Sequence, residues 1–247
     1  MSGHSKWATI KHKKGAADKA RGKLFAKVIR QVEVAAREGG GDVTANATLR
    51  TMVQKARDAS VPNDTVERAI KRGTGELEGV TYEAIAYEGY APGGVAVYVE
   101  VLTDNRNRTG AEVRNLFSKN GGSPAEPGAV AWQFERKGVL VVAGTEDDVM
   151  LAALDAGAED VLVDGSTCEV RTPPQLLPAV REAVEAAGLT VESSELSMVA
   201  SNSIDVTDVA EAKKVLRLID ALEDHDDVQN VYANFDIAES VLAEVEF

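Results

Sequence analysis

The chain has 247 residues and a formal net charge of −13, with 44% hydrophobic, 5% aromatic and 27% charged residues. No apolar run reaches the roughly 18 residues of a membrane span, and the N-terminal residues lack the apolar stretch of a secretory signal, so we expect a cytoplasmic protein without a membrane partner. The single cysteine, Cys168, excludes an internal disulfide and a cysteine-based zinc site.

Charge is distributed unevenly along the chain. Residues 1–37 contain ten Lys and Arg against two acids, whereas residues 138–247 contain five basic and 24 acidic side chains. Because like charges held together repel, a basic segment in an acidic chain indicates a polyanionic partner such as nucleic acid. The alternative is that the basic part docks on the acidic part of the same chain, which would make nucleic-acid binding by the intact chain weak.

The first 80 residues predict a small helical bundle. Residues 1–14 have no clear period and are expected to form an arm, and helices are expected over 16–38, 46–59 and 65–72, the last with Asp64 as N-cap. The first helix carries its apolar residues on one face and cations on the other, and a solvated face is the alternative to a phosphate-binding ridge. The expected ridge residues are Lys19, Lys23, Lys27, Arg30 and Arg37.

After a linker at 73–79 the hydrophobic period changes to two. Strands are expected at 82–90, 95–102 and 130–135, with a helix at 109–119. Residues 139–198 then follow the order strand–helix–strand–strand–helix–strand, which is typical of a ferredoxin-like domain. The final helix, 209–223, and strand, 228–235, cannot form a domain alone and are expected to complete the sheet begun at Tyr82.

These patterns predict an α+β multidomain protein. An N-terminal three-helix bundle, residues 1–79, precedes two α+β (ferredoxin-like) domains. The second domain comprises residues 80–137 and 201–247, and the third, residues 138–200, is inserted in the second.

The N-terminal arm carries the clearest candidate site. Lys6, Lys11, Lys13 and Lys14 form a cationic cluster around Trp7, a combination that suits phosphate contacts with base stacking. The alternatives are a disordered basic tail for the cluster and, for Trp7, packing against the first helix.

A second candidate site lies between a predicted strand and helix, at residues 104–109. Backbone N–H groups at the start of a helix, together with Arg106 and Arg108, favour binding of an anion such as phosphate. The alternative is that Asp104 or Asn107 caps the helix and the arginines pair with nearby acids. The acidic residues 223–227 could attract a divalent cation, but they do not match an EF-hand and are better explained as a solvated turn.

The remaining signals argue against catalysis. His4 and His12 lack a third ligand, so no metal is expected, and neither a catalytic motif nor a cofactor motif is present. We therefore expect a protein that is not an enzyme and uses no cofactor.

Three stretches are similar to the YebC/PmpR family. They are MSGHSKW with IKHKK at residues 1–14, YEGYAPGGV at 87–95, and TDNRNRT at 103–109. The resemblance covers essentially the whole chain. It implies a fold of three domains, with the third inserted in the second, and a probable transcriptional regulator that binds DNA. Mitochondrial relatives are translational activators, and bacterial members have been connected to the ribosome.

The resulting hypothesis is a DNA-binding regulator of transcription acting through its basic N-terminal segment. A ribosome- or RNA-associated translation factor is the alternative, because charge does not distinguish DNA from RNA. A basic protein surface could bind the acidic C-terminal domains, and the sequence leaves the oligomeric state open. The candidate nucleic-acid-binding residues are Lys6, Trp7, Lys11, Lys13, Lys14, Lys19, Lys23, Lys27, Arg30, Arg106 and Arg108.

Overall fold

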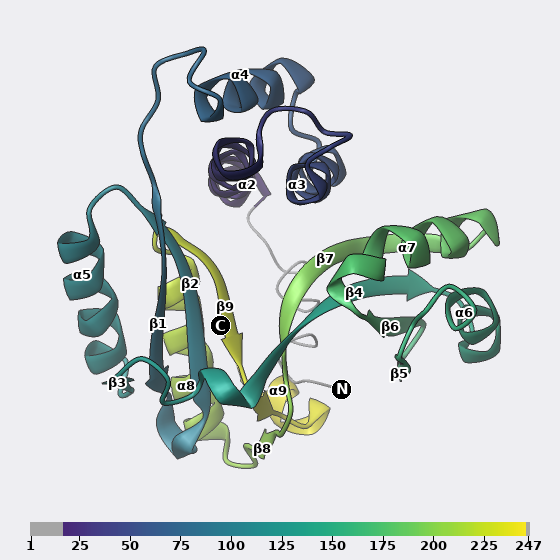
Figure 1. Cartoon of the computed structure of the whole chain (residues 1–247). Helices are drawn as coiled ribbons and strands as arrows, with labels where there is room; N and C mark the ends of the chain where they lie inside the picture. Colours follow the sequence, from purple (N-terminus) through teal and green to yellow (C-terminus); the bar gives the residue numbers. More distant parts are fainter. Residues whose placement is uncertain (1–16, 246–247) are drawn as a thin grey trace. The chain divides into compact units, whose positions relative to one another are not determined.

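A computed structural model describes residues 17–245, with the side chains of residues 17–21 and 239 left undescribed. The chain divides into two compact units (Figure 1). One unit comprises residues 135–199, and the other joins the preceding residues, up to 134, with those from 200 onward. The structure places the helical bundle and the first sheet in one unit, so the expected boundary at residue 79 stays a prediction.

The bundle consists of α2 (Ala17–Gly39), α3 (Ala47–Asp58) and α4 (Asn63–Gly73). The apolar faces expected from the sequence form its core, in which Val28, Val32 and Leu49 are at most 1% exposed. The expected N-cap of the third helix is wrong. The helix begins at Asn63, directly after Pro62, and has no side-chain cap. Pro62 occupies the N-cap position with φ −58° and ψ 136°, and its side chain has no polar atom that could accept a hydrogen bond from the first turn.

The first sheet consists of β1 (Glu83–Tyr90), β2 (Ala96–Thr103), β3 (Ser123–Ala125) and β9 (Val228–Ala233). Its order is β3-β1-β2-β9, and every neighbouring pair is antiparallel. The helices α5 (Arg106–Lys119) and α8 (Val209–Glu223) share a hydrophobic core with the sheet, to which Phe117, Leu216 and Ile219 contribute fully buried side chains. The last helix and strand therefore complete the sheet that β1 begins, as the sequence predicts.

A tight turn, Pro92–Gly94, joins β1 to β2. Gly93 and Gly94 have φ values of +77° and +78°, a conformation that favours glycine over residues with a Cβ. The short strands β8 (Ile204–Asp205) and β10 (Phe235–Asp236) form a parallel pair, and α9 (Glu239–Glu244) follows. The sequence predicted none of β3, β8 and α9 as separate elements, because runs of two to six residues carry too little periodicity.

The unit 135–199 has the expected ferredoxin-like order. Its elements are β4 (Phe134–Ala143), α6 (Glu146–Ala153), β5 (Asp160–Asp164), β6 (Thr167–Thr172), α7 (Leu177–Ala186) and β7 (Thr190–Ala200). The strand order is β5-β6-β4-β7, and α6 and α7 contribute to the core with the sheet. The separate strand expected at 130–135 is wrong. Ala131–Gln133 form a 3-10 turn, and one long strand starts at Phe134.

Candidate nucleic-acid interface

The candidate residues of the N-terminal arm precede the part of the chain that the structure describes. Lys6, Trp7, Lys11, Lys13 and Lys14 lie outside the described residues, and Lys19 lies in α2 with an undescribed side chain. The structure therefore describes the side chains of the second half of the expected ridge, from Lys23 onward.

Three ridge cations bind the turn that follows α8. Lys23 Nζ donates to the backbone oxygen of Asp224 at 3.0 Å and also contacts the Asp224 carboxylate. Lys27 Nζ donates to the backbone oxygen of Glu223 at 2.6 Å. Arg30 Nη1 donates to the backbone oxygen of Asp226 at 2.8 Å and to the Asp227 carboxylate at 3.1 Å. This face of α2 is therefore not simply solvated, since a row of negative oxygens lies along it.

The end of α8 suits these cations for a physical reason. The last carbonyls of a helix lack intrahelical donors, and the helix dipole makes this end negative. A basic residue in the last turn would normally compensate, but α8 has none there and is followed by acids. Lys23, Lys27 and Arg30 supply this compensation from another helix. The sequence leaves docking of the basic part on the acidic part of the same chain as the alternative to a polyanionic partner. Lys23, Lys27 and Arg30 make such intrachain contacts.

Asp227 is the buried centre of this contact. Its side chain is 9% exposed and accepts hydrogen bonds from Thr109 Oγ1 at 2.7 Å, Arg108 Nη2 at 2.7 Å and Thr103 Oγ1 at 3.2 Å, besides the one from Arg30. Burial alone would raise the pKa of the Asp227 carboxyl. The hydrogen bonds from Thr109 and Arg108 and the charges of Arg108 and Arg30 outweigh burial, and the pKa lies below its ordinary value.

The turn at 223–227 is therefore not solvated along its whole length, which corrects the expectation from the sequence. Asp224 is exposed, but Asp227, directly before β9, is buried. Sequence reasoning missed Asp227, Thr103 and Thr109 as a group, because they come together only when β2, α5 and β9 assemble. Thr103 and Thr109 begin and end the stretch TDNRNRT, but nothing in the sequence connects that stretch with Asp227.

Arg106 and Arg108 lie in the first turn of α5, which starts three residues earlier than expected. Asn105 caps this helix by accepting a hydrogen bond from the Arg108 backbone, so the expectation of Asp104 or Asn107 as the cap is wrong. Arg106 pairs with Glu83 at 3.2 Å. Arg108 pairs with Asp104 at 3.0 Å and Asp227 at 2.7 Å. Both arginines thus contact acids, which was the alternative to anion binding.

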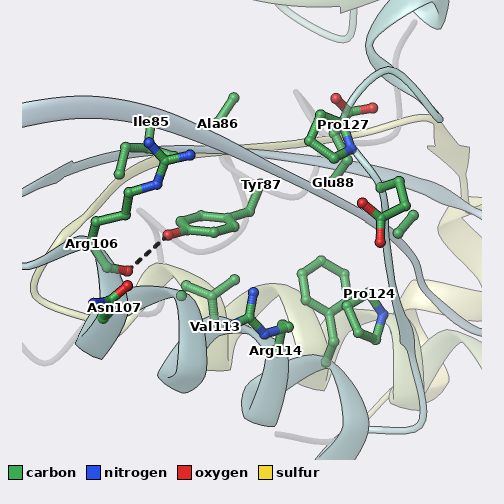
Figure 2. Close-up of a pocket in the computed structure, with 14 residues that line it drawn as sticks. Ile85, Ala86, Tyr87, Glu88, Arg106, Asn107, Val113, Arg114, Pro124 and Pro127 are labelled. Atoms are coloured by element: carbon green, nitrogen blue, oxygen red, sulfur yellow. Dashed lines mark hydrogen bonds between the residues drawn. The ribbon is translucent and has the colours of Figure 1, made fainter.

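A cavity of about 360 Å³ lies between β1, α5 and the residues around β3. The segments 87–95 and 103–109 meet here. In Figure 2, Tyr87 of β1 lies beside Arg106 and Arg114 of α5, and its hydroxyl donates to the Arg106 backbone oxygen at 3.4 Å. Carboxylates of Glu88 and Glu126 also line the cavity, so its charge favours neither anions nor cations.

Glu88 lines this cavity and also binds the loop at residues 128–131. Its carboxylate accepts hydrogen bonds from the backbone N–H groups of Gly128 and Val130, both at 2.6 Å, and of Ala131 at 2.9 Å. Burial alone would raise the pKa of the Glu88 carboxyl, but the three hydrogen bonds outweigh it and leave the pKa below its ordinary value. The charge of Glu88 therefore has a structural role in holding the loop before β4.

The described residues offer neither a metal centre nor a membrane span. In residues 17–245, no group of three or more His, Cys, Asp and Glu side chains is placed to hold a metal ion. In that same part of the chain, every helix is too short or too polar to cross a membrane.

Comparison with known proteins identifies close relatives over the whole length. A family model described as "TACO1/YebC protein N-terminal domain" matches residues 5–76, and one described as "TACO1/YebC second and third domain" matches residues 82–235. Proteins named "Probable transcriptional regulatory protein" from Rubrobacter xylanophilus and Halothermothrix orenii are 59% and 54% identical, each over 99% of both chains.

A solved structure shows the same fold. The crystal structure of a conserved hypothetical protein from Aquifex aeolicus superimposes with a TM-score of 0.85 at 45% identity, covering 94% of this chain and 97% of that one. The resemblance to the YebC/PmpR family, inferred from three short stretches, is confirmed at full length. On the two family-model matches and these identities, the chain belongs to the TACO1/YebC family.

Proposed function

We propose that this protein is a regulator that binds nucleic acid, with duplex DNA as its partner and transcription as the regulated process. The observation that carries the proposal is the concentration of ten cations in residues 1–37, in a chain with a net charge of −13. Relatives more than 50% identical are named probable transcriptional regulatory proteins, which agrees with this role. The protein would act in the cytoplasm, without catalysis and without a cofactor.

The proposal assigns affinity to the arm and the ridge together. Lys6, Lys11, Lys13 and Lys14 would contact phosphates, and Trp7 would stack on a base or enter a groove. Lys19, Lys23, Lys27 and Arg30 would extend the contact along α2. Arg106 and Arg108 would contribute only after exchanging their present carboxylate partners for phosphate.

Salt dependence tests the arm. We expect the variant Lys11→Gln, Lys13→Gln, Lys14→Gln to bind a labelled DNA duplex more weakly, with a salt slope smaller by about 0.9 for each phosphate that the variant no longer neutralises. The matched control neutralises three exposed cations of α8, Lys213, Lys214 and Arg217, and should leave the slope unchanged. Equal slopes for the two variants in fluorescence anisotropy would remove the arm from the interface.

RNA is the second candidate partner, because the pairing of arginines in α4 agrees with RNA binding as well as with DNA binding. The short helix α4 offers Arg68, Lys71 and Arg72 as candidate contacts to nucleic acid. Of these, Arg68 pairs with Asp64 at 3.4 Å and Arg72 with the buried Glu33 at 2.9 Å. Binding through backbone phosphates and shape, without base readout, fits structured RNA as well as DNA. Cosedimentation with ribosomes, compared with capture on duplex DNA from the same lysate, distinguishes a translation factor from a transcription regulator.

A further inference from the structure

Three cations of the α2 ridge already bind residues 223–227 of the same chain. The oxygen atoms of these residues resemble the phosphate oxygens of the proposed nucleic-acid ligand. Lys23, Lys27 and Arg30 bind backbone and carboxylate oxygens of residues 223–227, and such oxygens attract ammonium and guanidinium groups as phosphate oxygens do. We propose that the turn 223–227 is an intrachain competitor of nucleic acid, which reaches the ridge only by displacing this turn. This inference rests on the proposed function and adds a form of regulation to it.

The contact is graded from an exposed end to a buried end. Lys23 and Asp224 form an ion pair whose side chains are 31% and 77% exposed. At the other end, Arg30 and Asp227 are 23% and 9% exposed. Exposed pairs contribute little and are screened by salt, whereas buried pairs are screened much less. An approaching polyanion therefore competes first for Lys23 and last for Arg30.

A groove beside the contact gives access to it. About 670 Å³ in volume, it is lined by Lys23 and Arg30 from α2, by Arg108 and Glu112 from α5, and by residues 224–227 of the turn. Tyr82 and Asp104 complete the lining. Arg30 also lies over the Tyr82 ring, 5.4 Å from its centroid. The cations are therefore reachable from the surface while the turn still holds them.

When Lys23, Lys27 and Arg30 leave the turn, the other hydrogen bonds of Asp227 remain in place. Asp227 keeps Arg108, Thr103 and Thr109 as partners when Arg30 departs, so its carboxylate is not left unpaired. The bundle core and the core under the first sheet are separate hydrophobic clusters, and the ion pairs described here are polar contacts between them. Opening this contact therefore exposes no buried apolar core, which makes the exchange reversible.

The segment that connects the helical bundle to the first sheet allows the ridge and the turn to separate. Residues 74–82 join α4 to β1, and all of them are exposed or partly exposed and lie outside any helix or strand. A hydrogen bond from Arg37 Nη1 to the Val80 backbone oxygen, at 3.1 Å, ties this segment to α2. A segment of this length can follow the bundle when the ridge exchanges the turn for phosphate.

The test neutralises the exposed acids of the turn in the full-length chain. Asp224→Asn with Asp226→Asn removes one charge that pairs with Lys23 and one that lines the groove beside it. The control Asp147→Asn with Asp148→Asn removes two exposed charges from the first turn of α6. Affinity for a labelled DNA duplex and for an RNA hairpin is measured by anisotropy at low salt. We expect the turn variant to bind about 3- to 10-fold more tightly than wild type and the control to bind as wild type does.

Hydrogen exchange provides a second readout that does not depend on any substitution. Saturating wild-type protein with the duplex should accelerate exchange in residues 223–227, while residues 109–119 of α5 stay protected. Unchanged exchange in the turn, or equal affinities for the turn variant and its control, would overturn the competition while leaving nucleic-acid binding in place. If neither wild type nor the turn variant binds DNA or RNA, the proposed function and the competition both fail.

Discussion

At the scale of single residues, two buried carboxylates organise the unit that contains the first sheet. Asp227 joins β9 to α5 and α2, and Glu88 holds the loop that precedes β4. In both cases hydrogen bonds to the ionised form outweigh the cost of burial, so each pKa lies below its ordinary value. A lowered pKa in the folded state means that the ionised carboxylate stabilises the fold above about pH 4 and that this contribution disappears as the pH falls through the folded-state pKa.

The variant Asp227→Asn should lower the free energy of unfolding at pH 7 by about 1–3 kcal/mol, because Arg108 and Arg30 lose a charged partner in a buried site. The difference from wild type should shrink as the pH falls below about 4, because the carboxyl group of the unfolded chain takes up its proton at a higher pH than that of the folded protein. Urea unfolding at several pH values measures both effects. The neighbouring exposed acid is the control, and Asp226→Asn should change stability by less than about 0.5 kcal/mol. A loss that persists unchanged at low pH would contradict the role of the charge.

The variant Glu88→Gln should loosen the loop at 128–131. A glutamine has one acceptor oxygen, so one of the three backbone N–H groups now faces an amide that donates. We expect a loss of about 1–2 kcal/mol and faster hydrogen exchange in residues 128–131. The exposed Glu126 provides the matched control, and Glu126→Gln should leave exchange in this loop unchanged. Retained protection in Glu88→Gln would show that the loop is held by other contacts.

At the scale of elements, the start of α5 shows how one cap sets the direction of the Arg108 side chain. Asn105 accepts the Arg108 N–H at 3.1 Å and is itself positioned by a hydrogen bond from its own N–H to Thr103 Oγ1, at 2.9 Å. This arrangement starts the helix at Arg106 and directs Arg108 toward Asp104 and Asp227. The cap therefore supports the buried contact at Asp227 as well as the helix.

Asn105→Ala should cost about 1 kcal/mol of stability, because the first turn of α5 loses its side-chain acceptor. Asp104→Ala, one residue earlier, removes an exposed ion pair with Arg108 and should cost less than half as much. Chemical unfolding of the two variants compares the residue that the structure assigns as cap with one that the sequence suggested. A larger loss for Asp104→Ala would reverse the assignment.

At the scale of the whole molecule, the described residues form three separate hydrophobic cores. One lies in the bundle, one under the first sheet and one in the unit 135–199, and no residue belongs to two of them. Aromatic side chains are few, and Val, Leu, Ile and Ala supply most of each core. Destabilising one core should therefore have little direct effect on the packing of the others.

Cys168 reports on the core of the unit 135–199. Its thiol is fully buried, and burial, with a contribution from the charge of Glu146, raises its pKa, so a thiol reagent should react only after local unfolding. Leu140→Ala in the same core should cost about 2–5 kcal/mol and accelerate modification of Cys168. Leu216→Ala in the core under the first sheet is the control and should leave the Cys168 rate unchanged. Equal acceleration by both variants would show that the chain unfolds as one unit.

Much of the secondary structure follows from local patterns in the sequence. The apolar face of α2, the alternation in β1 and β2, and the strand–helix order of residues 134–200 are signals that depend on neighbouring residues alone. The structure departs from these predictions mainly at ends and short elements. Pro62 precedes the start of α4, and Asn105 caps the start of α5. Elements of two or three residues show no periodicity from which they could be predicted.

The sequence by itself determined the fold class, the family and the separation of positive from negative charge along the chain. Composition and periodicity carry that information, because it depends on which residues follow one another. Only the tertiary structure decided which charges meet. It brought Lys23, Lys27 and Arg30 to a turn about 200 positions away and buried Asp227 among Thr103, Arg108 and Thr109. Charge pairing depends on distances of a few ångströms between side chains, and those distances exist only after the sheet and helices assemble.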